Sequence, residues 1–243
     1  MRLLVVGAGE MGRWFADTCG AEAISFADRD HGTARTAAET IDGAKAVELD
    51  TDETFDVVCL AVPMSAVPDA IASHADRATD AVVDVSGEMR DTVAALETHA
   101  DDRECASFHP LFSASNAPGS IPVVTVSDGD TIDRIRSALD AAGNDVFETT
   151  VADHDRAMET VQVKAHTAVL AYALAADEVD PRFHTSISGP LSELKAGLTG
   201  NTPDVYAEIQ ARFDGSEAIA DAAAKLADAD HERFIELYEE AGE

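Results

Sequence analysis

A glycine-rich stretch near the N-terminus constrains the fold of this chain more than any other part of the sequence. The apolar run RLLVV, residues 2–6, leads into GAGEMG, which has the spacing G-x-G-x-x-G ahead of a helical pattern. In such a turn the first glycine permits the tight bend, the second lets the backbone approach a pyrophosphate, and the third lets the helix pack closely. The pattern predicts a dinucleotide-binding turn at a helix N-terminus, with an incidental glycine turn as the alternative. The residues expected in the turn are Gly7, Gly9, Glu10, Met11 and Gly12.

Apolar strand patterns alternate with alanine-rich helical patterns through the first 150 residues. The strand patterns are AISFAD, VVCLAVP (57–63), AVVDVS (81–86), IPVVTVS (121–127) and, more weakly, CASFHP. The helical stretches between them include AVPDAIASHAD and DRIRSALDAAG. Continuously apolar strands that alternate with helices predict a parallel sheet covered on both faces. We therefore expect residues 1–150 to form an α/β domain, a doubly wound sheet of the Rossmann type that binds a dinucleotide.

After residue 150 the sequence contains helical patterns only. DHDRAMETVQVKAHTAVLAYALAAD indicates one long helix, SGPLSELKAGLTG and TPDVYAEIQARF indicate two more, and the remainder indicates one or two. These apolar helices are short for an independent core, which favours their burial against a second copy of the chain. We expect residues 151–243 to form a smaller all-α domain that contributes to substrate binding and forms a homodimer.

The chain is strongly acidic. It has 47 Asp and Glu against 17 Lys and Arg, a net charge of −30, and the acids are spread along the chain rather than gathered in a tail. At ~1 M salt the Debye length is roughly 3 Å, so this self-repulsion would be screened. The composition therefore favours a halophilic protein, and it argues against nucleic acid or an anionic membrane as a partner.

The apolar run at the N-terminus is too short for a signal peptide, so we expect a cytoplasmic protein. Its three cysteines, Cys19, Cys59 and Cys105, are widely spaced and lack the spacing of metal ligands. We interpret them as buried or half-buried free thiols of a reducing compartment, and we expect no metal site.

Several predicted strands end in residues suited to binding a dinucleotide. Asp28 follows Gly7 by 21 residues, where a carboxylate would bind the ribose hydroxyls of NAD. Arg29 beside it could instead bind the phosphate of NADP, so NADP stays open. The AVP end of the next strand, with Val62 and Pro63, lies at the same carboxyl edge of the sheet, where ligands bind in open α/β folds.

His109 ends the strand that follows DVS, residues 84–86, so both are expected at that edge, where a hydride would change hands. The ordinary pKa of histidine, about 6.5, suits a group that accepts a proton near neutrality. His154 lies between two aspartates, and a plain helix-start residue is as good an interpretation as a ligand contact. His166 is equally compatible with a core histidine and with a binding residue.

Taken together, these stretches resemble the prephenate dehydrogenase family over nearly the whole chain. The matching segments, in the family's order, are VVGAGEMGRWF, LAVPMSAVPDAI, VVDVS, FHPLFS, DHDRAMETVQ, AHTAVLAYAL, ISGPLSEL and TPDVYAEI. The His-Pro element and the later His-Asp helix are specific in combination. The match is closest to members fused to a chorismate mutase; because the first strand starts at Arg2, we expect no mutase domain. The acidic composition would make this a haloarchaeal-type version.

The resemblance implies the NAD-dependent oxidative decarboxylation of prephenate to 4-hydroxyphenylpyruvate, a reaction of tyrosine biosynthesis. The family's catalytic histidine matches His109, whose neutral imidazole would take the proton of the substrate's C4 hydroxyl, with Ser86 as a further catalytic residue. The substrate-binding residues that the resemblance suggests are Ser86, Arg90, His154, Gln162, His166 and Lys195.

The sequence departs from the family pattern at two cations. A lysine common after the D-x-x-S strand end is replaced here by Met89 or Arg90, and the helix after the S-x-P turn has Lys195 in place of an arginine. Prephenate is a dianion, so a cation must hold it; the candidates are Lys195, Arg182, Lys164 and Arg90. Arogenate as substrate, another small imine or F420-linked reductase, and a non-catalytic dinucleotide-binding sensor stay as alternatives.

Overall fold

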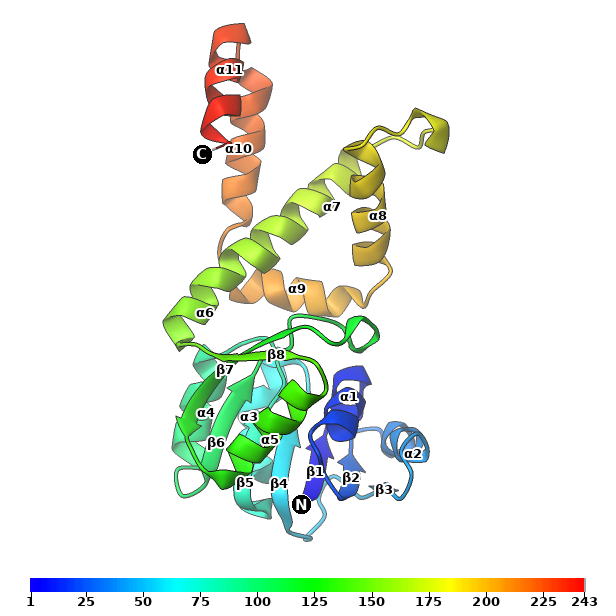
Figure 1. Cartoon of the computed structure of the whole chain (residues 1–243), viewed down its shortest axis with the longest axis vertical. Coiled ribbons are helices and arrows are strands. Elements are labelled where there is room, and N and C mark those ends of the chain that lie inside the picture. The colour runs from blue at the N-terminus through cyan, green and yellow to red at the C-terminus, as the bar shows by residue number, and fades with distance from the viewer. Residues whose placement is uncertain (243) are drawn as a thin grey trace. The chain divides into compact units, whose positions relative to one another are not determined.

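The computed structural model describes residues 1–242 and divides into two compact units (Figure 1). Unit 1 comprises Met1–Asp155, and unit 2 begins at Arg156. The division falls inside a helix, α6 (Val151–Met158), which starts in unit 1 and continues into unit 2. The sequence patterns placed this division slightly earlier, at residue 150.

Unit 1 is built on one eight-stranded sheet with the strand order β3-β2-β1-β4-β5-β6-β7-β8. Its strands are β1 (Arg2–Val6), β2 (Ala23–Ala27), β3 (Lys45–Ala46), β4 (Phe55–Leu60), β5 (Ala78–Asp84), β6 (Glu104–Phe108), β7 (Ser120–Ser127) and β8 (Asp145–Glu148). The helices around it are α1 (Glu10–Thr18), α2 (His31–Glu39), α3 (Val67–His74), α4 (Arg90–His99) and α5 (Asp130–Ala141). The order reverses between β1 and β4, which is the switch point where doubly wound folds bind their ligands.

The predicted α/β fold class is confirmed, with one difference in strand direction. Strands β1 to β6 are parallel to their neighbours, but β7 is antiparallel to β6, and β8 runs parallel to β7. The prediction of an all-parallel sheet is therefore wrong at this edge. The reason is the connection: residues 109–119 form a short irregular segment without a crossover helix, so the chain can only return in the opposite direction.

Apolar side chains fill both faces of the sheet. One cluster joins β1 and β4 to α1, α2 and α5 through residues such as Phe15, Ala34 and Ile135, all fully buried. The other cluster joins the same strands to α3 and α4 through Ile71 and Leu96. The strands are therefore held from both sides, and their carboxyl ends are fixed relative to one another.

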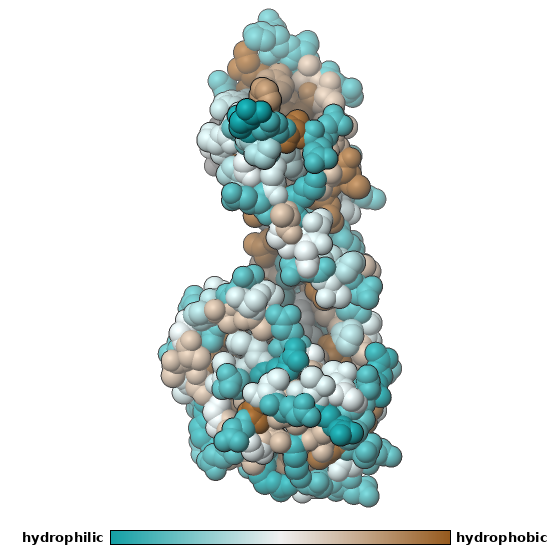
Figure 2. Space-filling model, turned by 90° about the vertical axis from the view of Figure 1, so that its right-hand side faces the viewer, coloured by the Kyte–Doolittle hydropathy of each residue, from teal (hydrophilic) through white to brown (hydrophobic). Residues whose placement is uncertain are grey.

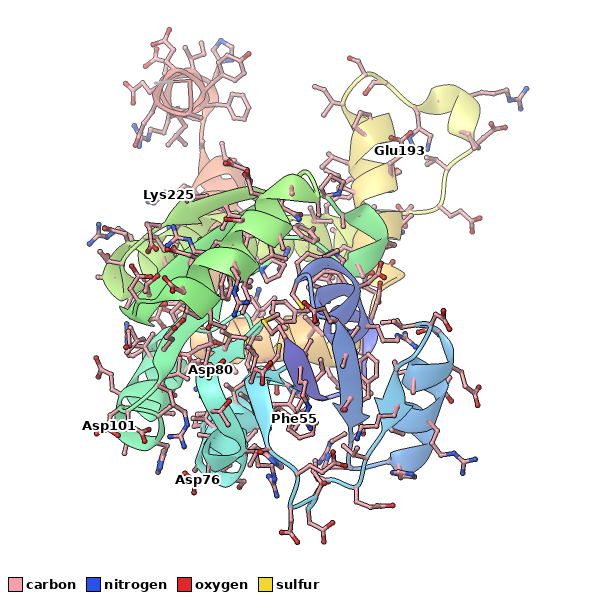
Figure 3. All side chains as sticks on the ribbon, turned by 60° about the horizontal axis from the view of Figure 1, so that its bottom comes forward. Phe55, Asp76, Asp80, Asp101, Glu193 and Lys225 are labelled. Carbon is pink, nitrogen blue, oxygen red and sulfur yellow. The ribbon has the colours of Figure 1, made fainter. Side chains whose placement is uncertain are left out.

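Many acidic side chains of unit 1 lie at its surface, and its core is apolar. Figure 3 shows Phe55 among the strands and Asp76, Asp80 and Asp101 at the outside of the unit. Phe55 is 1% exposed, whereas the three aspartates are exposed to solvent. These three acids lie at the surface, whereas Asp84, Glu88 and Asp155 are buried.

Unit 2 is entirely helical in the part that the structure describes. After α6 the chain forms a π-helix (Glu159–Lys164) and then α7 (Ala165–Ala175), α8 (Ser188–Thr199), α9 (Pro203–Arg212), α10 (Ser216–Asp228) and α11 (His231–Glu240), with a 3₁₀ turn at Pro181–Phe183. The predicted long helix thus contains one π-helical segment, and the last segment forms two helices. Pro203 is the first residue of α9, where its missing N–H is harmless.

Unit 2 exposes many apolar side chains. Figure 2 shows apolar residues on its surface. Leu174 is 89% exposed, Phe183 is 78% exposed and Ile187 is 71% exposed. None of the residues of α7, α8, α10 or α11 is buried in the described chain.

Candidate active site

The glycine-rich turn lies between β1 and α1 and packs against the end of β4. Gly7 has a φ of +100°, and a Cβ there would lie 2.3 Å from the carbonyl oxygen of Ala61. A Cβ on Gly12 would lie 2.1 Å from the carbonyl oxygen of Gly7. Both positions therefore require glycine for the bend and for the close approach of α1 to the strand.

Gly9 is different, because a Cβ there would meet no atom within 4 Å. It is the N-cap residue of α1, and no side chain caps that helix within the described structure. The second glycine of the motif thus presents open backbone at a helix N-terminus, with Glu10 and Met11 next in the chain, which is the arrangement that phosphate groups bind. The turn fits a dinucleotide pyrophosphate.

Asp28 supports this turn from the end of β2. Its carboxylate accepts hydrogen bonds from the backbone N–H of Ala8, at 2.9 Å, and of Asp30, at 3.0 Å. Arg29 beside it is exposed. At the end of β4, the Cγ1 of Val62 would lie 3.1 Å from a Cβ on Gly7, so Val62 lies against the turn, and Pro63 follows at the surface.

His109 follows the last residue of β6 at the same carboxyl edge of the sheet. Its side chain is buried, and its backbone N–H donates to the carbonyl oxygen of Pro122 at 3.0 Å. A Cβ at Gly87 would lie 3.1 Å from His109 Nε2 and 3.1 Å from the Sδ of Met64. A side chain at position 87 would therefore crowd Nε2 of His109. The sequence patterns missed Gly87, although it directly follows the DVS strand end that they had singled out.

Four side chains from three elements form a continuous chain of contacts behind His109. Its Nδ1 lies 2.8 Å from Nε2 of His154, and Nδ1 of His154 lies 3.1 Å from Oδ1 of Asp155. The other oxygen of Asp155 pairs with Arg90 at 3.1 Å. His154 is 2% exposed, so it is not simply a polar residue at a helix start. Of the candidates for substrate binding, His154 thus contacts the candidate base, and Arg90 is linked to His154 through Asp155.

Burial governs the protonation of both imidazoles. It lowers the pKa of His109 to about 3, with a smaller contribution from the neighbouring His154. Burial also lowers the pKa of His154, although its hydrogen bond to Asp155 and the charges of Asp155 and Glu88 oppose this. His109 is thus a neutral imidazole at pH 7, as a proton acceptor must be, and its pKa lies well below the ordinary value that the sequence suggested.

Ser86 is held by a buried aspartate. Its backbone N–H and its hydroxyl both donate to Oδ2 of Asp84, at 2.9 Å and 2.5 Å. Asp84 is fully buried in the sheet, and burial raises the pKa of its carboxyl to about 6, although the Ser86 hydrogen bonds oppose this. The catalytic role suggested for Ser86 stays a prediction.

The remaining substrate-binding candidates belong to unit 2. Gln162 lies on the π-helix, His166 on α7 and Lys195 on α8. Burial lowers the pKa of His166, and its ring stacks edge-on against Tyr206 with centroids 4.9 Å apart. Arg182, another candidate cation, pairs with its neighbour Asp180 at 2.6 Å.

Two further properties concern residues 1–242 as a whole. Cys19, Cys59 and Cys105 are free and buried, as predicted. Within these residues no group of three or more His, Cys, Asp or Glu side chains is arranged to hold a metal ion, and no helix is long and apolar enough to cross a membrane.

Comparison with known proteins agrees with this geometry. Residues 2–88 match the family described as NADP oxidoreductase, coenzyme F420-dependent. Over 89% of its length, the chain is 26% identical to 4-amino-4-deoxyprephenate dehydrogenase from Streptomyces pristinaespiralis, covering 78% of that protein. This similarity supports the resemblance of the chain to the prephenate dehydrogenase family.

Solved structures share its fold. Prephenate dehydrogenase from Aquifex aeolicus, in complex with hydroxyphenyl propionate and NAD+, aligns with a TM-score of 0.67 at 16% identity, over 99% of this chain and 88% of that one. Synechocystis arogenate dehydrogenase aligns with a TM-score of 0.64 at 15% identity, over 100% and 98%. The comparisons support an oxidoreductase of the prephenate/arogenate dehydrogenase type that uses a nicotinamide dinucleotide.

Proposed function

We propose that this protein is an NAD-dependent prephenate dehydrogenase, which converts prephenate to 4-hydroxyphenylpyruvate and CO2 in tyrosine biosynthesis. The observation that carries the proposal is the neutral, buried imidazole of His109, which lies at the sheet edge that also holds the glycine-rich turn. A proton acceptor at the dinucleotide-binding edge is what the oxidation of a hydroxyl-bearing carbon requires.

The residues of unit 1 would hold the dinucleotide as follows. The backbone at Gly9 and the N-terminus of α1 would bind the pyrophosphate, and Asp28 or Arg29 would face the adenosine ribose. When bound, the nicotinamide supplies the hydride acceptor. The Asp28 carboxylate at the end of β2 favours NAD, because it would repel the additional phosphate of NADP.

His109 would perform the proton transfers. As the C4–H bond of the substrate loses its hydride, the C4 hydroxyl becomes acidic, and Nε2 of His109 takes its proton. The bond between C1 and the ring carboxylate then breaks, CO2 leaves, and the electron pair enters the ring. The phenolate oxygen takes the proton back from His109, so the reaction releases no net proton. A fixed base helps because charge develops on that oxygen only in the transition state.

The substrate carboxylates need cations in a chain of net charge −30. Arg90 is the candidate in unit 1, and its guanidinium already pairs with Asp155. Lys195, Lys164 and Arg182 are the candidates in unit 2, and Arg182 is likewise paired, with Asp180. Ser86 of unit 1, and Gln162 and His166 of unit 2, stay predictions as further substrate-binding residues.

A second substrate class has a specific observation in its favour. The sequence relative from Streptomyces is named for 4-amino-4-deoxyprephenate, which carries an amino group where prephenate has its C4 hydroxyl. A neutral imidazole can accept a hydrogen bond from either group. Arogenate, the substrate named for the Synechocystis structure, differs only in the side chain away from C4.

We further propose that the protein is a cytoplasmic, halophilic homodimer. The buried free cysteines suit a reducing compartment. Unit 2 exposes apolar side chains, among them Leu174 and Phe183. Apolar side chains are buried best against another apolar surface, and a second copy of the chain would supply one. Dispersed acids disfavour nucleic acid and anionic membranes as partners.

The test is substrate-dependent reduction of NAD and of NADP in molar salt. Prephenate, arogenate and 4-amino-4-deoxyprephenate are compared in the wild type, in His109→Asn and in His99→Asn, an exposed histidine that serves as a matched control. We expect turnover of prephenate with NAD, its loss in His109→Asn, and NADH binding unchanged in both variants. A preference for one of the other two compounds would make that compound, instead of prephenate, the substrate. NADH binding without turnover of any of the three compounds would favour the alternative of a non-catalytic dinucleotide-binding sensor.

A further inference from the structure

We infer that His154 and Asp155 are positioning residues for His109. They determine which nitrogen of His109 carries its proton, and they share the positive charge that forms when His109 binds a second one. The kinetic consequence rests on the proposed role of His109 as the base, whereas the proton positions follow from contacts within unit 1 alone.

The proton positions follow from the acceptor at the end of the chain. An ionised carboxylate can only accept, so Nδ1 of His154, 3.1 Å from Oδ1 of Asp155, must carry a hydrogen. In a neutral His154 the other nitrogen, Nε2, then has a lone pair. It lies 2.8 Å from Nδ1 of His109, which must therefore donate. Nε2 of His109 is left as the acceptor, and it is the nitrogen that a side chain at position 87 would crowd, since a Cβ there would lie 3.1 Å from it.

The opposite arrangement is disfavoured by the same carboxylate. If Nε2 of His154 donated to His109, a neutral His154 would turn the lone pair of Nδ1 toward Asp155, and two acceptors would face each other. Arg90 donates to the other carboxylate oxygen of Asp155, so that oxygen too acts as an acceptor. Only a doubly protonated His154 would allow the reverse direction, and its burial opposes that form.

The same contacts matter when His109 takes a proton at Nε2. A positive imidazolium in a buried site is unfavourable unless it is paired. The Nδ1 proton of His109 can move to His154, which places the charge beside Asp155. The groups that the described contacts of unit 1 place near this charge are Asp155 on α6, Glu88 after β5, Arg90 on α4 and His109 itself.

The first test reads the tautomers directly. Nitrogen NMR of the full-length protein, labelled with ¹⁵N in its histidines, distinguishes a protonated from an unprotonated ring nitrogen, and the His109→Asn and His154→Gln variants assign the signals. We expect the proton on Nδ1 in both residues of the wild type at pH 7. In Asp155→Asn we expect this fixed pattern to be lost. A proton on Nε2 of His109 in the wild type would overturn the inference.

The second test separates positioning from proton sharing. In His154→Gln an amide oxygen can still accept from His109 but cannot take up a proton, so we expect kcat to fall about 100-fold with KM within about twofold. In His154→Ala, added imidazole should restore part of the lost kcat in proportion to its unprotonated form. A kcat of His154→Gln within about twofold of the wild type would overturn the charge-sharing role.

The two tests keep this inference apart from the proposed function. If the wild type turns over none of the three substrates, the function fails, and the NMR of the same protein still decides the tautomers. If the wild type is active and His109 carries its proton on Nε2, the inference fails and the function stands. If His154→Gln does not fold, the wild-type spectrum and Asp155→Asn decide the question.

Discussion

Replacing Gly9 by alanine should separate the fold of the glycine-rich turn from its binding function. Gly9 has φ −70° and ψ −170°, which alanine adopts without strain, and its Cβ would meet no atom within 4 Å. Such a replacement restricts the unfolded chain, so we expect the free energy of unfolding to rise by about 0.4–1 kcal/mol. The added methyl group would lie where the pyrophosphate must approach the backbone. We therefore expect the affinity for NADH to fall at least tenfold, about 1.4 kcal/mol.

Two assays follow these effects. Thermal unfolding in molar salt measures stability, and energy transfer from tryptophan to NADH measures binding. Trp14, on α1 beside the turn, is the single tryptophan of the chain, so its signal reports this site.

Two other glycines provide controls. Gly197→Ala, on α8, also meets no atom within 4 Å, and it should raise stability without changing NADH affinity. Gly12→Ala should lose stability, because its Cβ would lie 2.1 Å from the carbonyl oxygen of Gly7. If Gly9→Ala bound NADH as tightly as the wild type, the turn would not be the phosphate-binding site.

Four further outcomes are expected. Burial raises the pKa of Asp84 from 3.8 to about 6, so the wild type should lose up to about 3 kcal/mol of stability as the pH rises from about 4 past 6. Asp84→Asn avoids this loss, so at pH 8 it should be more stable than the wild type by up to the same amount, measured by urea unfolding. Burial lowers the pKa of His109 to about 3 from an ordinary 6.5, so this residue contributes stability above pH 6.5 that is lost as the pH falls. His109→Asn should therefore reduce the loss in the free energy of unfolding at pH 5 by about 2 kcal/mol, and an unchanged decline of stability in acid would contradict this. Gly87→Ala, with its Cβ 3.1 Å from His109 Nε2, should lower kcat about tenfold and leave NADH affinity unchanged in a binding titration. Light scattering in molar salt should show a dimer that Leu174→Glu makes monomeric and Glu178→Gln does not; a monomeric wild type would refute the dimer.

Local sequence patterns were sufficient to predict most of the fold of unit 1. The GAGEMG turn could be predicted because its glycines meet requirements set within a few residues, at Gly7 by a positive φ and at Gly12 by the close approach of α1. The parallel strands β1, β2, β4, β5 and, more weakly, β6 followed from their apolar character. Strand β7 is equally apolar, but its direction depends on the segment 109–119 that precedes it, and an apolar strand looks the same in either direction. The two-residue strand β3 carries too few side chains to show a pattern.

The sequence by itself determined the fold class of the first unit, the glycine-rich turn and the choice of His109 as the candidate base. Only the tertiary structure decided what His109 touches. His154 lies 45 residues further along the chain, and it meets His109 because β8 leads into α6 at the carboxyl edge of the sheet. Burial at that contact, rather than residue type, lowers the pKa of His109, and Gly87 is needed there because another chain segment lies against it. Spacing along a sequence specifies turns and strands, but contacts between distant segments arise only when the packed sheet brings their ends together.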